Sequence, residues 1–280
     1  MTSSWAALAH RAGDPTTDPG ATVLTLDVTG TRVALVVVVV VATGVAALVN
    51  LTGSLGHAAA VLRASARALV QLLAVALVIA AVLGSLPLTV AFLAVMATVA
   101  STTAGRRLGT GRGGGWAGAA VLGGALPAFL LIVGSGLVPA TGTALVPIGG
   151  ILVGGAMTAT VLAGRRCLDA LDSRHGEYLA SLAIGLDPRA AALLVCRDDA
   201  ALALLPGLDQ TRTVGLVTLP GAFVGMLLGG ASPLAAAAVQ LVVLVALLMV
   251  QSVAVLVVVE LVATGRIGGR TRRDVSGWAC

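Results

Sequence analysis

Residues 234–261 read LAAAAVQLVVLVALLMVQSVAVLVVVEL, an apolar stretch whose single charged residue, Glu260, stands near its end. A helix needs about 20 apolar residues to cross a bilayer, at about 1.5 Å per residue. The stretch exceeds that length, and it lacks the alternation of polar and apolar residues that marks a membrane strand. We therefore expect a membrane-spanning helix here, long enough to tilt or to extend beyond the bilayer.

The rest of the chain repeats this pattern. Hydrophobic residues make up 58% of it and charged residues 10%, with a mean hydropathy of +1.05, whereas a soluble domain has about 25% charged residues. The other apolar runs are Val33–Leu51, Ala66–Leu83, Leu88–Ala104, Trp116–Val133, Ala144–Ala163 and Thr213–Leu228. These runs predict an all-α integral membrane protein with about seven transmembrane helices.

Arginines indicate how the spans are oriented. Gaps that contain arginine alternate with gaps that contain none. The arginines at the former are Arg63, Arg67, Arg106, Arg107, Arg112, Arg165, Arg166, Arg174, Arg189, Arg197, Arg212, Arg266, Arg270, Arg272 and Arg273. Because cytoplasmic loops are enriched in basic residues, we expect a multi-pass plasma-membrane protein with its N-terminus outside and its C-terminus in the cytoplasm. Membrane anchoring accounts for the basic residues, so no nucleic-acid partner is expected.

Three parts follow from this topology. Residues 1–32 are expected to be an extracytoplasmic tail, 33–262 the transmembrane domain and 263–280 a cytoplasmic tail. Within the domain, residues 164–212 form a long cytoplasmic loop, and loops of that length are usually functional. A loop that packs only on its own helix bundle is the alternative.

The loop reads as two short helices with a sharp break between them. An amphipathic pattern from Glu177 to Ile184 predicts the first helix, which Gly185 would end. Asp187 is expected to cap the second helix, with Pro188 in its first turn. Pro206 and Gly207 are expected to end it.

The break resembles the cytoplasmic coupling loop of ABC-transporter permeases. Ala180, Gly185 and Pro188 match that pattern, and Leu179 stands where the pattern has Glu. Other motifs point to one family of such permeases. They are Arg67 with Gln71, Pro147-Ile-Gly-Gly150, Gly154-Gly-Ala-Met157, Arg197-Asp198, Thr213–Gly221 with its Leu-Pro-Gly, and Gln240. Together, over residues 63–261, they resemble the FetB-like family of small iron-export ABC permeases.

The resemblance implies a homodimeric permease in the lipid bilayer that binds a separate ABC ATPase subunit. The helix at 177–184 would sit in a cleft of that ATPase, and Arg197 with Asp198 would brace the second loop helix. The exported substrate would be a small metal cation such as iron. ATP hydrolysis would reside in the partner, since the chain has no lysine for a phosphate-binding loop. No catalytic residue and no cofactor are therefore expected in this chain.

Glycines and polar residues in the spans have two interpretations each. Gly150 and Gly154, like Gly221 and Gly225, are spaced by four, which favours close helix packing within one subunit or between two. Pro220 is expected to bend its helix, and we hypothesise that this bend lines the pathway. Polar side chains that could pack between helices or contact substrate include Gln71 and Gln240, and the soft metal-ligand candidates are Met157, Met226 and Met249. Glu260 is expected to lie near Arg266.

Cys167 and Cys196 fall in the loop assigned to the reducing cytoplasm, so free thiols are expected. Three other classes of function stay open at this point. A gradient-driven transporter or channel would need functional charges inside the spans. A membrane scaffold would bind a partner and move nothing. An intramembrane enzyme is disfavoured because no paired catalytic groups occur in the sequence.

Overall fold

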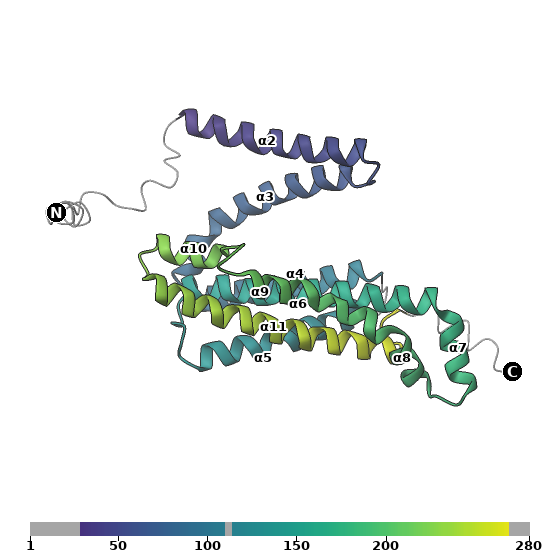
Figure 1. Cartoon of the computed structure of the whole chain (residues 1–280). Helices are drawn as coiled ribbons and strands as arrows, with labels where there is room; N and C mark the ends of the chain where they lie inside the picture. The colour runs from purple at the N-terminus through teal and green to yellow at the C-terminus, as the bar shows by residue number, and fades with distance from the viewer. Residues whose placement is uncertain (1–28, 110–113, 269–280) are drawn as a thin grey trace, which may run out of the picture. The chain divides into compact units, whose positions relative to one another are not determined.

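The computed structural model describes residues 29–109 and 114–268, and these ranges are helical apart from short turns (Figure 1). The helices are α2 (Thr29–Thr52), α3 (Ala58–Leu83), α4 (Leu86–Arg107), α5 (Gly114–Gly134), α6 (Gly142–Ser173), α7 (His175–Ala183), α8 (Pro188–Ala201), the 3-10 turn η1 (Leu202–Leu204), α9 (Leu205–Thr213), α10 (Gly221–Leu228) and α11 (Pro233–Ala263). The predicted all-α fold is confirmed. Most of the two expected tails, at 1–28 and 269–280, lies outside the described residues.

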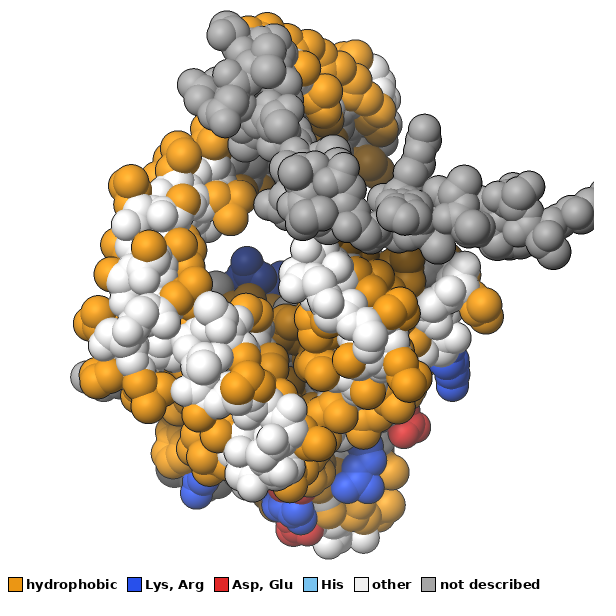
Figure 2. All heavy atoms as spheres, turned by 90° about the vertical axis from the view of Figure 1, so that its left-hand side faces the viewer, with side chains coloured by type: hydrophobic (Ala, Val, Ile, Leu, Met, Phe, Trp, Pro, Cys, Tyr) orange, Lys and Arg blue, Asp and Glu red, His pale blue; other side chains and the backbone are white. Residues whose placement is uncertain are grey.

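Six helices in the described ranges are long and apolar enough to cross a membrane. They are α2, α3, α4, α5, α6 and α11. Figure 2 shows one face of the molecule, on which hydrophobic side chains far outnumber charged ones. Such a composition suits contact with lipid, since the bilayer core offers no water to solvate charges.

The remaining apolar run, Thr213–Leu228, is not one helix. α9 ends at Thr213, and Gly215 has a φ of +83°, which closes a tight turn. Pro220 has no backbone N–H and disfavours helical geometry at the residue before it, so α10 begins only at Gly221. The bend expected at Pro220 is thus a complete interruption of the helix. Residues 214–220, between α9 and α10, are largely apolar like their neighbours but are not helical.

The chain divides into two compact units. One is Met1–Ala80 with Met226–Ala231, and its helices α2 and α3 are joined by a turn with positive φ at Ser54 and Gly56. The other is Ala81–Gly225 with Ser232–Cys280, and it contains the candidate site.

The second unit is built on α4, α5, α6 and α11, which pack side by side (Figure 1). Its core contains many small side chains, among them Ala120, Ala156 and Ala254, all fully buried. A Cβ built on Gly124 would lie 2.6 Å from the Val250 carbonyl oxygen. Small residues at such contacts let helix backbones approach closely, as in membrane bundles.

Three of these helices run in the same direction. On α6, Gly155 faces Leu247 of α11, and further along Gly164 faces Val258. Along α4 the order is the same, because Gly142 at the start of α6 faces Thr89 and Gly150 faces Met96. Because α6 and α11 are parallel, the chain between Ser173 and Pro233 must return along the length of the bundle.

Candidate functional site

α7 and its end form the first part of the site. The predicted loop helix is confirmed, and it starts at His175, two positions before Glu177. Gly185 has a φ of +96°, and the N–H groups of Gly185 and Leu186 donate to Leu182 O and Ser181 O at 3.0 and 3.1 Å. No described atom lies within 4 Å of a Cβ built there, so it is the backbone conformation that favours glycine. Ala180 lies on the exposed side of α7.

α8 starts as the sequence predicts. The Asp187 carboxylate accepts hydrogen bonds from the N–H groups of Arg189 and Ala190 at 3.1 and 3.2 Å, and Pro188 occupies the first turn. The expected end of this helix at Pro206 and Gly207 is wrong. α8 ends at Ala201, and after the 3-10 turn η1 a new helix, α9, begins at Leu205. Pro206 then stands in a first turn, where its missing N–H breaks no helical hydrogen bond.

Arg174 joins the corner between α6 and α7 to α8. Its guanidinium donates to the Val195 carbonyl oxygen and to the Asp199 carboxylate. It also lies 3.8 Å from Glu177 on the next turn. One cation thus holds three helices together at the point where the chain turns.

Arg189 joins α8 to α11. Its Nε and Nη2 donate to the two carboxylate oxygens of Glu260 at 2.8 and 2.7 Å. The hydrogen bond to Glu260, and then its negative charge, raise the pKa of Arg189 above the ordinary value. Glu260 is expected to lie near Arg266, but its carboxylate pairs with Arg189, and the Arg266 guanidinium lies 4.6 Å from the Trp116 ring centroid.

Arg197 and Asp198 do not form the expected brace. Both side chains are exposed on α8, and within the described ranges neither forms an ion pair. The next residue, Asp199, supplies the contact to Arg174. The difference is one of helical phase, because Val195 and Asp199 lie one turn apart on the face that meets α6.

Cys167 of α6 and Cys196 of α8 are joined by a disulfide, so the expectation of free thiols is wrong. Their Cα atoms are 4.7 Å apart and both residues are fully buried. The bond fastens the middle of α8 to the bundle.

The last span also contacts the loop helices. The Gln251 carboxamide of α11 lies against Gly207 of α9, where a Cβ would overlap its Oε1 atom. On its other side the carboxamide nitrogen is 3.9 Å from the Cβ position of Gly155 on α6. The sequence does not predict this contact, because Gln251 and Gly207 belong to different segments of the chain and meet only through helix packing.

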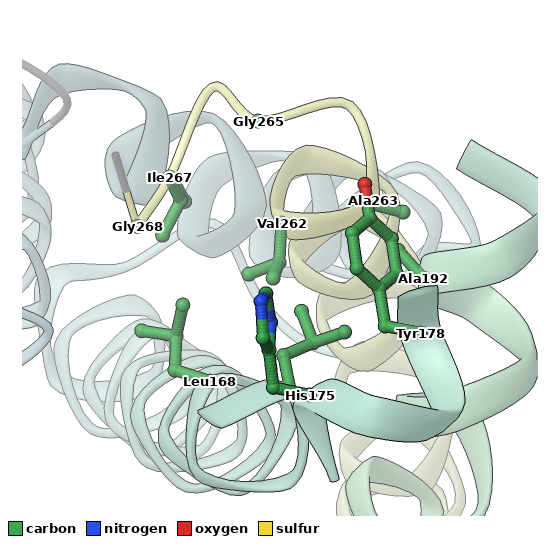
Figure 3. A pocket seen from close by; sticks show the side chains of 10 residues that line it. Leu168, His175, Tyr178, Ala192, Val262, Ala263, Gly265, Ile267 and Gly268 are labelled. Carbon is green, nitrogen blue, oxygen red and sulfur yellow. The ribbon is translucent and has the colours of Figure 1, made fainter. Parts of the chain in front are cut away.

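A small hollow lies where α6, α7, α8 and the end of α11 meet (Figure 3). Its volume is about 40 Å³, and Leu168, Val262 and Ile267 are among its lining residues. Figure 3 shows the His175 ring projecting between these side chains. The Nδ1 atom of His175 is buried there with no hydrogen-bond partner among the described residues. A space of this size admits a water molecule or two.

The residues expected to line a pathway lie on several different elements. A Cβ on Gly150 would meet Met96 at 3.0 Å, whereas Gly154, Gly221 and Gly225 face open space within the described residues. Gln240 is buried, and its carboxamide oxygen has no hydrogen-bond partner in the part of the chain that the structure describes. Pro220 precedes α10, and Gln71 lies on α3 in the other unit.

The three candidate soft ligands lie on three helices, with Met157 on α6, Met226 on α10 and Met249 on α11. No group of three or more His, Cys, Asp or Glu that could hold a metal ion occurs among the described residues. The described part of the chain therefore offers no resident metal centre built from those residue types.

The amino-acid sequence is similar to those of known membrane proteins. The model of the "Uncharacterised protein family (UPF0014)" matches residues 31–265. Similar proteins include "Protein ALUMINUM SENSITIVE 3" of Arabidopsis thaliana (39% identity, 46% of this chain and 47% of the relative) and "UPF0014 membrane protein STAR2" of Oryza sativa subsp. japonica (36%, 48% and 47%). "Probable iron export permease protein FetB" of Escherichia coli is 32% identical over 40% of this chain and 44% of its own length.

The aligned part of the chain spans about half the length of these curated relatives. No solved structure matches the chain.

Proposed function

The chain belongs to the UPF0014 family of membrane proteins, and from that premise we propose that it is the membrane-spanning permease subunit of an ABC transporter. The observation that carries the proposal is the broken pair of loop helices, with α7 ended by Gly185 and α8 capped by Asp187 and fastened to two long helices. A loop that served only as a connection would not need three separate side-chain ties.

The exposed apolar side chains of α7 support docking of a separate ATPase. Leu179 is 44% exposed, and Ile184, at the helix end, is 79% exposed. Apolar side chains on a short projecting helix suit insertion into a groove of a partner. Glu177, Ala180 and Gly185 would shape this contact, and Pro188 with Asp187 would set the direction of the helix that follows.

The proposed substrate is a small metal cation such as iron, exported from the cytoplasm. The name of the Escherichia coli relative supports this substrate and direction. We further propose that two copies of the chain assemble with two ATPase subunits.

Arginines support an orientation with the loop in the cytoplasm of a plasma-membrane protein. The Arg165 side chain donates to the Arg107 carbonyl oxygen at 3.0 and 2.9 Å, so the ends of α4 and α6 carry their basic residues to one end of the bundle. Basic residues concentrate on the cytoplasmic side of membrane proteins. The chain would then begin outside and finish inside.

The test is co-purification. The tagged chain is solubilised in mild detergent, and its partners are identified by mass spectrometry. A stoichiometric ABC ATPase is expected with the wild-type chain and is expected to be lost with Ile184→Glu. Leu194→Glu serves as the matched control, because Leu194 is 66% exposed on α8, outside α7. Absence of an ATPase from the wild-type preparation, even after cross-linking, would overturn the proposal.

A second measurement addresses the substrate. Inside-out vesicles containing the complex are supplied with ferrous iron and ATP. Uptake that requires ATP is expected, and it is expected to fall to background with Ile184→Glu. ATP-independent uptake driven by an ion gradient would instead indicate a secondary transporter.

A further inference from the structure

Within the described residues, three side-chain ties hold α8, and one of them, the Arg189–Glu260 pair, reaches α11. The Cys167–Cys196 disulfide and the Arg174 contacts both fasten α8 to α6 and its corner with α7. The tie to α11 is the Arg189–Glu260 pair, which links residues 71 positions apart. The first two ties therefore bind α6, α7 and α8 into one body. That body packs on α11 through α6, where Gly155 faces Leu247 and Gly164 faces Val258. Arg189 adds an ion pair between α8 and the last span.

The geometry of the pair suits the transmission of force. Two parallel N–H···O bonds from one guanidinium to one carboxylate resist both sliding and rotation, which a single contact does not. The position of Arg189 is itself fixed, because its backbone N–H donates to the Asp187 cap at 3.1 Å. Any displacement of the chain at Gly185 thus reaches Arg189 through a capped, hydrogen-bonded turn.

A second contact, nearer the start of α11, adds to the connection between the loop helices and the last span. The helical segment α8–η1–α9 meets α11 at Glu260 and again at Gln251, where the carboxamide lies on Gly207. The two contacts lie nine residues apart on α11, about 14 Å along a helix. The segment α8–η1–α9 therefore contacts α11 at two positions, and the ion pair at Glu260 is the one nearer α7.

We propose that Arg189 and Glu260 are positioning residues that carry the movement of α7 to α11, and so to the far end of the bundle. This inference rests on the proposed function, because the movement originates in the ATPase. When nucleotide binding displaces α7, the ion pair would make α11 move together with the α6–α7–α8 body. Without the pair, the loop would still dock but the last span would no longer follow it.

The test measures movement at the far end. Leu88→Cys on α4 and Leu234→Cys on α11 carry nitroxide labels in a Cys280→Ser background, since both leucines are exposed at helix starts in the same unit. The distance between the labels is measured by pulsed electron spin resonance, without and with Mg²⁺ and a non-hydrolysable ATP analogue. The sample is the chain with its co-purified ATPase.

The wild-type complex is expected to show a nucleotide-dependent shift in this distance. Arg189→Gln and Glu260→Gln are each expected to lose the shift while ATPase stoichiometry and monodispersity stay unchanged. The exchanged pair, Arg189→Glu with Glu260→Arg, is expected to recover at least part of it. Arg212→Gln is the control, because the ion pair that Arg212 forms within the described ranges is an exposed one with Asp209, 3.6 Å away in its own helix.

Several outcomes would overturn the inference. A shift that persists in both single variants would show that packing alone moves α11, and loss of the ATPase from Arg189→Gln would show that the pair serves docking. If the distance between the two labels in the wild-type complex does not change when nucleotide binds, α11 does not move relative to α4. Absence of any ATPase from the wild-type preparation is a different result, because it removes the proposed function on which the inference rests.

Discussion

At the scale of single residues, Gly185 and Gly176 form a natural pair for comparison. Nothing lies within 4 Å of a Cβ built on either one, so neither position is limited by space. They differ in backbone, because Gly185 has a φ of +96° whereas Gly176 lies inside α7. The requirement for glycine at the break is therefore conformational.

Gly185→Val is expected to destabilise the break by about 1–2 kcal/mol, since side chains with a Cβ rarely adopt positive φ. Hydrogen exchange of the peptide spanning α7 and the first turn of α8 would report this as faster exchange. Gly176→Ala is expected to slow exchange in α7 or leave it unchanged, because alanine favours helix over glycine. Equal effects of the two substitutions would contradict the conformational explanation.

Gly207 is limited by space in the way that Gly185 is not. A Cβ at Gly207 would overlap Oε1 of Gln251, so Gly207→Ala is expected to cost about 1–3 kcal/mol, the range for overpacked interiors. Thermal unfolding in detergent would show a lowered midpoint. Gln251→Ala combined with Gly207→Ala is expected to recover most of the loss, since the shorter side chain vacates the space.

Gly154→Ala is the control for this pair, because a Cβ there meets nothing within 4 Å among the described residues. If Gly207→Ala unfolds at the wild-type temperature, or if removing Gln251 brings no recovery, the contact between α9 and α11 is not as described.

The sequence predicts local chemistry at this scale and misses distant pairing. Gly185, Asp187 and Pro188 act on the backbone within three residues of themselves, so their roles in ending α7 and starting α8 follow from general rules. Arg174 and Asp199 are 25 positions apart, and Arg189 and Glu260 are 71 apart. Such partners depend on how the helices pack, which residue type alone does not determine.

At the scale of elements, the disulfide between α6 and α8 decides how firmly the loop is attached. Cys167 and Cys196 are both fully buried, and thiol–disulfide exchange needs access to sulfur. We therefore expect dithiothreitol to leave the bond intact in the folded chain and to reduce it readily in denaturant. Alkylation followed by mass spectrometry would count two additional modified thiols under denaturing, reducing conditions.

Cys167→Ser with Cys196→Ser serves as the control for that measurement, because it should show no additional thiols under either condition. Modification of both cysteines in the native chain without any reductant would contradict the bond and restore the expectation of free thiols.

The boundaries of the helices are a second feature that the sequence predicts incompletely. The long helices α6 and α11 follow directly from continuous apolar runs, whose length matches a membrane crossing. The run Thr213–Leu228 is as apolar, yet Gly215 and Pro220 divide it, and the helix preceding it extends back through α9 and η1 to α8. Hydropathy averages over these breaks, so it predicts a span at Thr213–Leu228 without revealing that the helix is interrupted.

At the scale of the whole molecule, the parallel arrangement of α6 and α11 constrains the topology of the second unit. α6 has 32 residues and α11 has 31, so each is about 46–48 Å long, more than a bilayer core needs. Their starts, at Gly142 and Pro233, lie at one end of the bundle, and their ends lie at the other. The chain from α7 to α10 must cover that length, although it contains no helix of spanning length.

This constraint predicts that the broken segment crosses the membrane, so that Thr141 and Ala231 face the same side. Single-cysteine variants at Thr141, Ala231 and Leu186, in a Cys280→Ser background, would be treated with a membrane-impermeant maleimide. In intact cells Thr141→Cys and Ala231→Cys are expected to react, and Leu186→Cys, between α7 and α8, only after permeabilisation. The disulfide-bonded Cys167 and Cys196 provide no background signal. If Ala231→Cys instead behaved like Leu186→Cys, α9 and α10 would not cross, α6 and α11 could not run parallel through one bilayer, and the proposed orientation would fall with them.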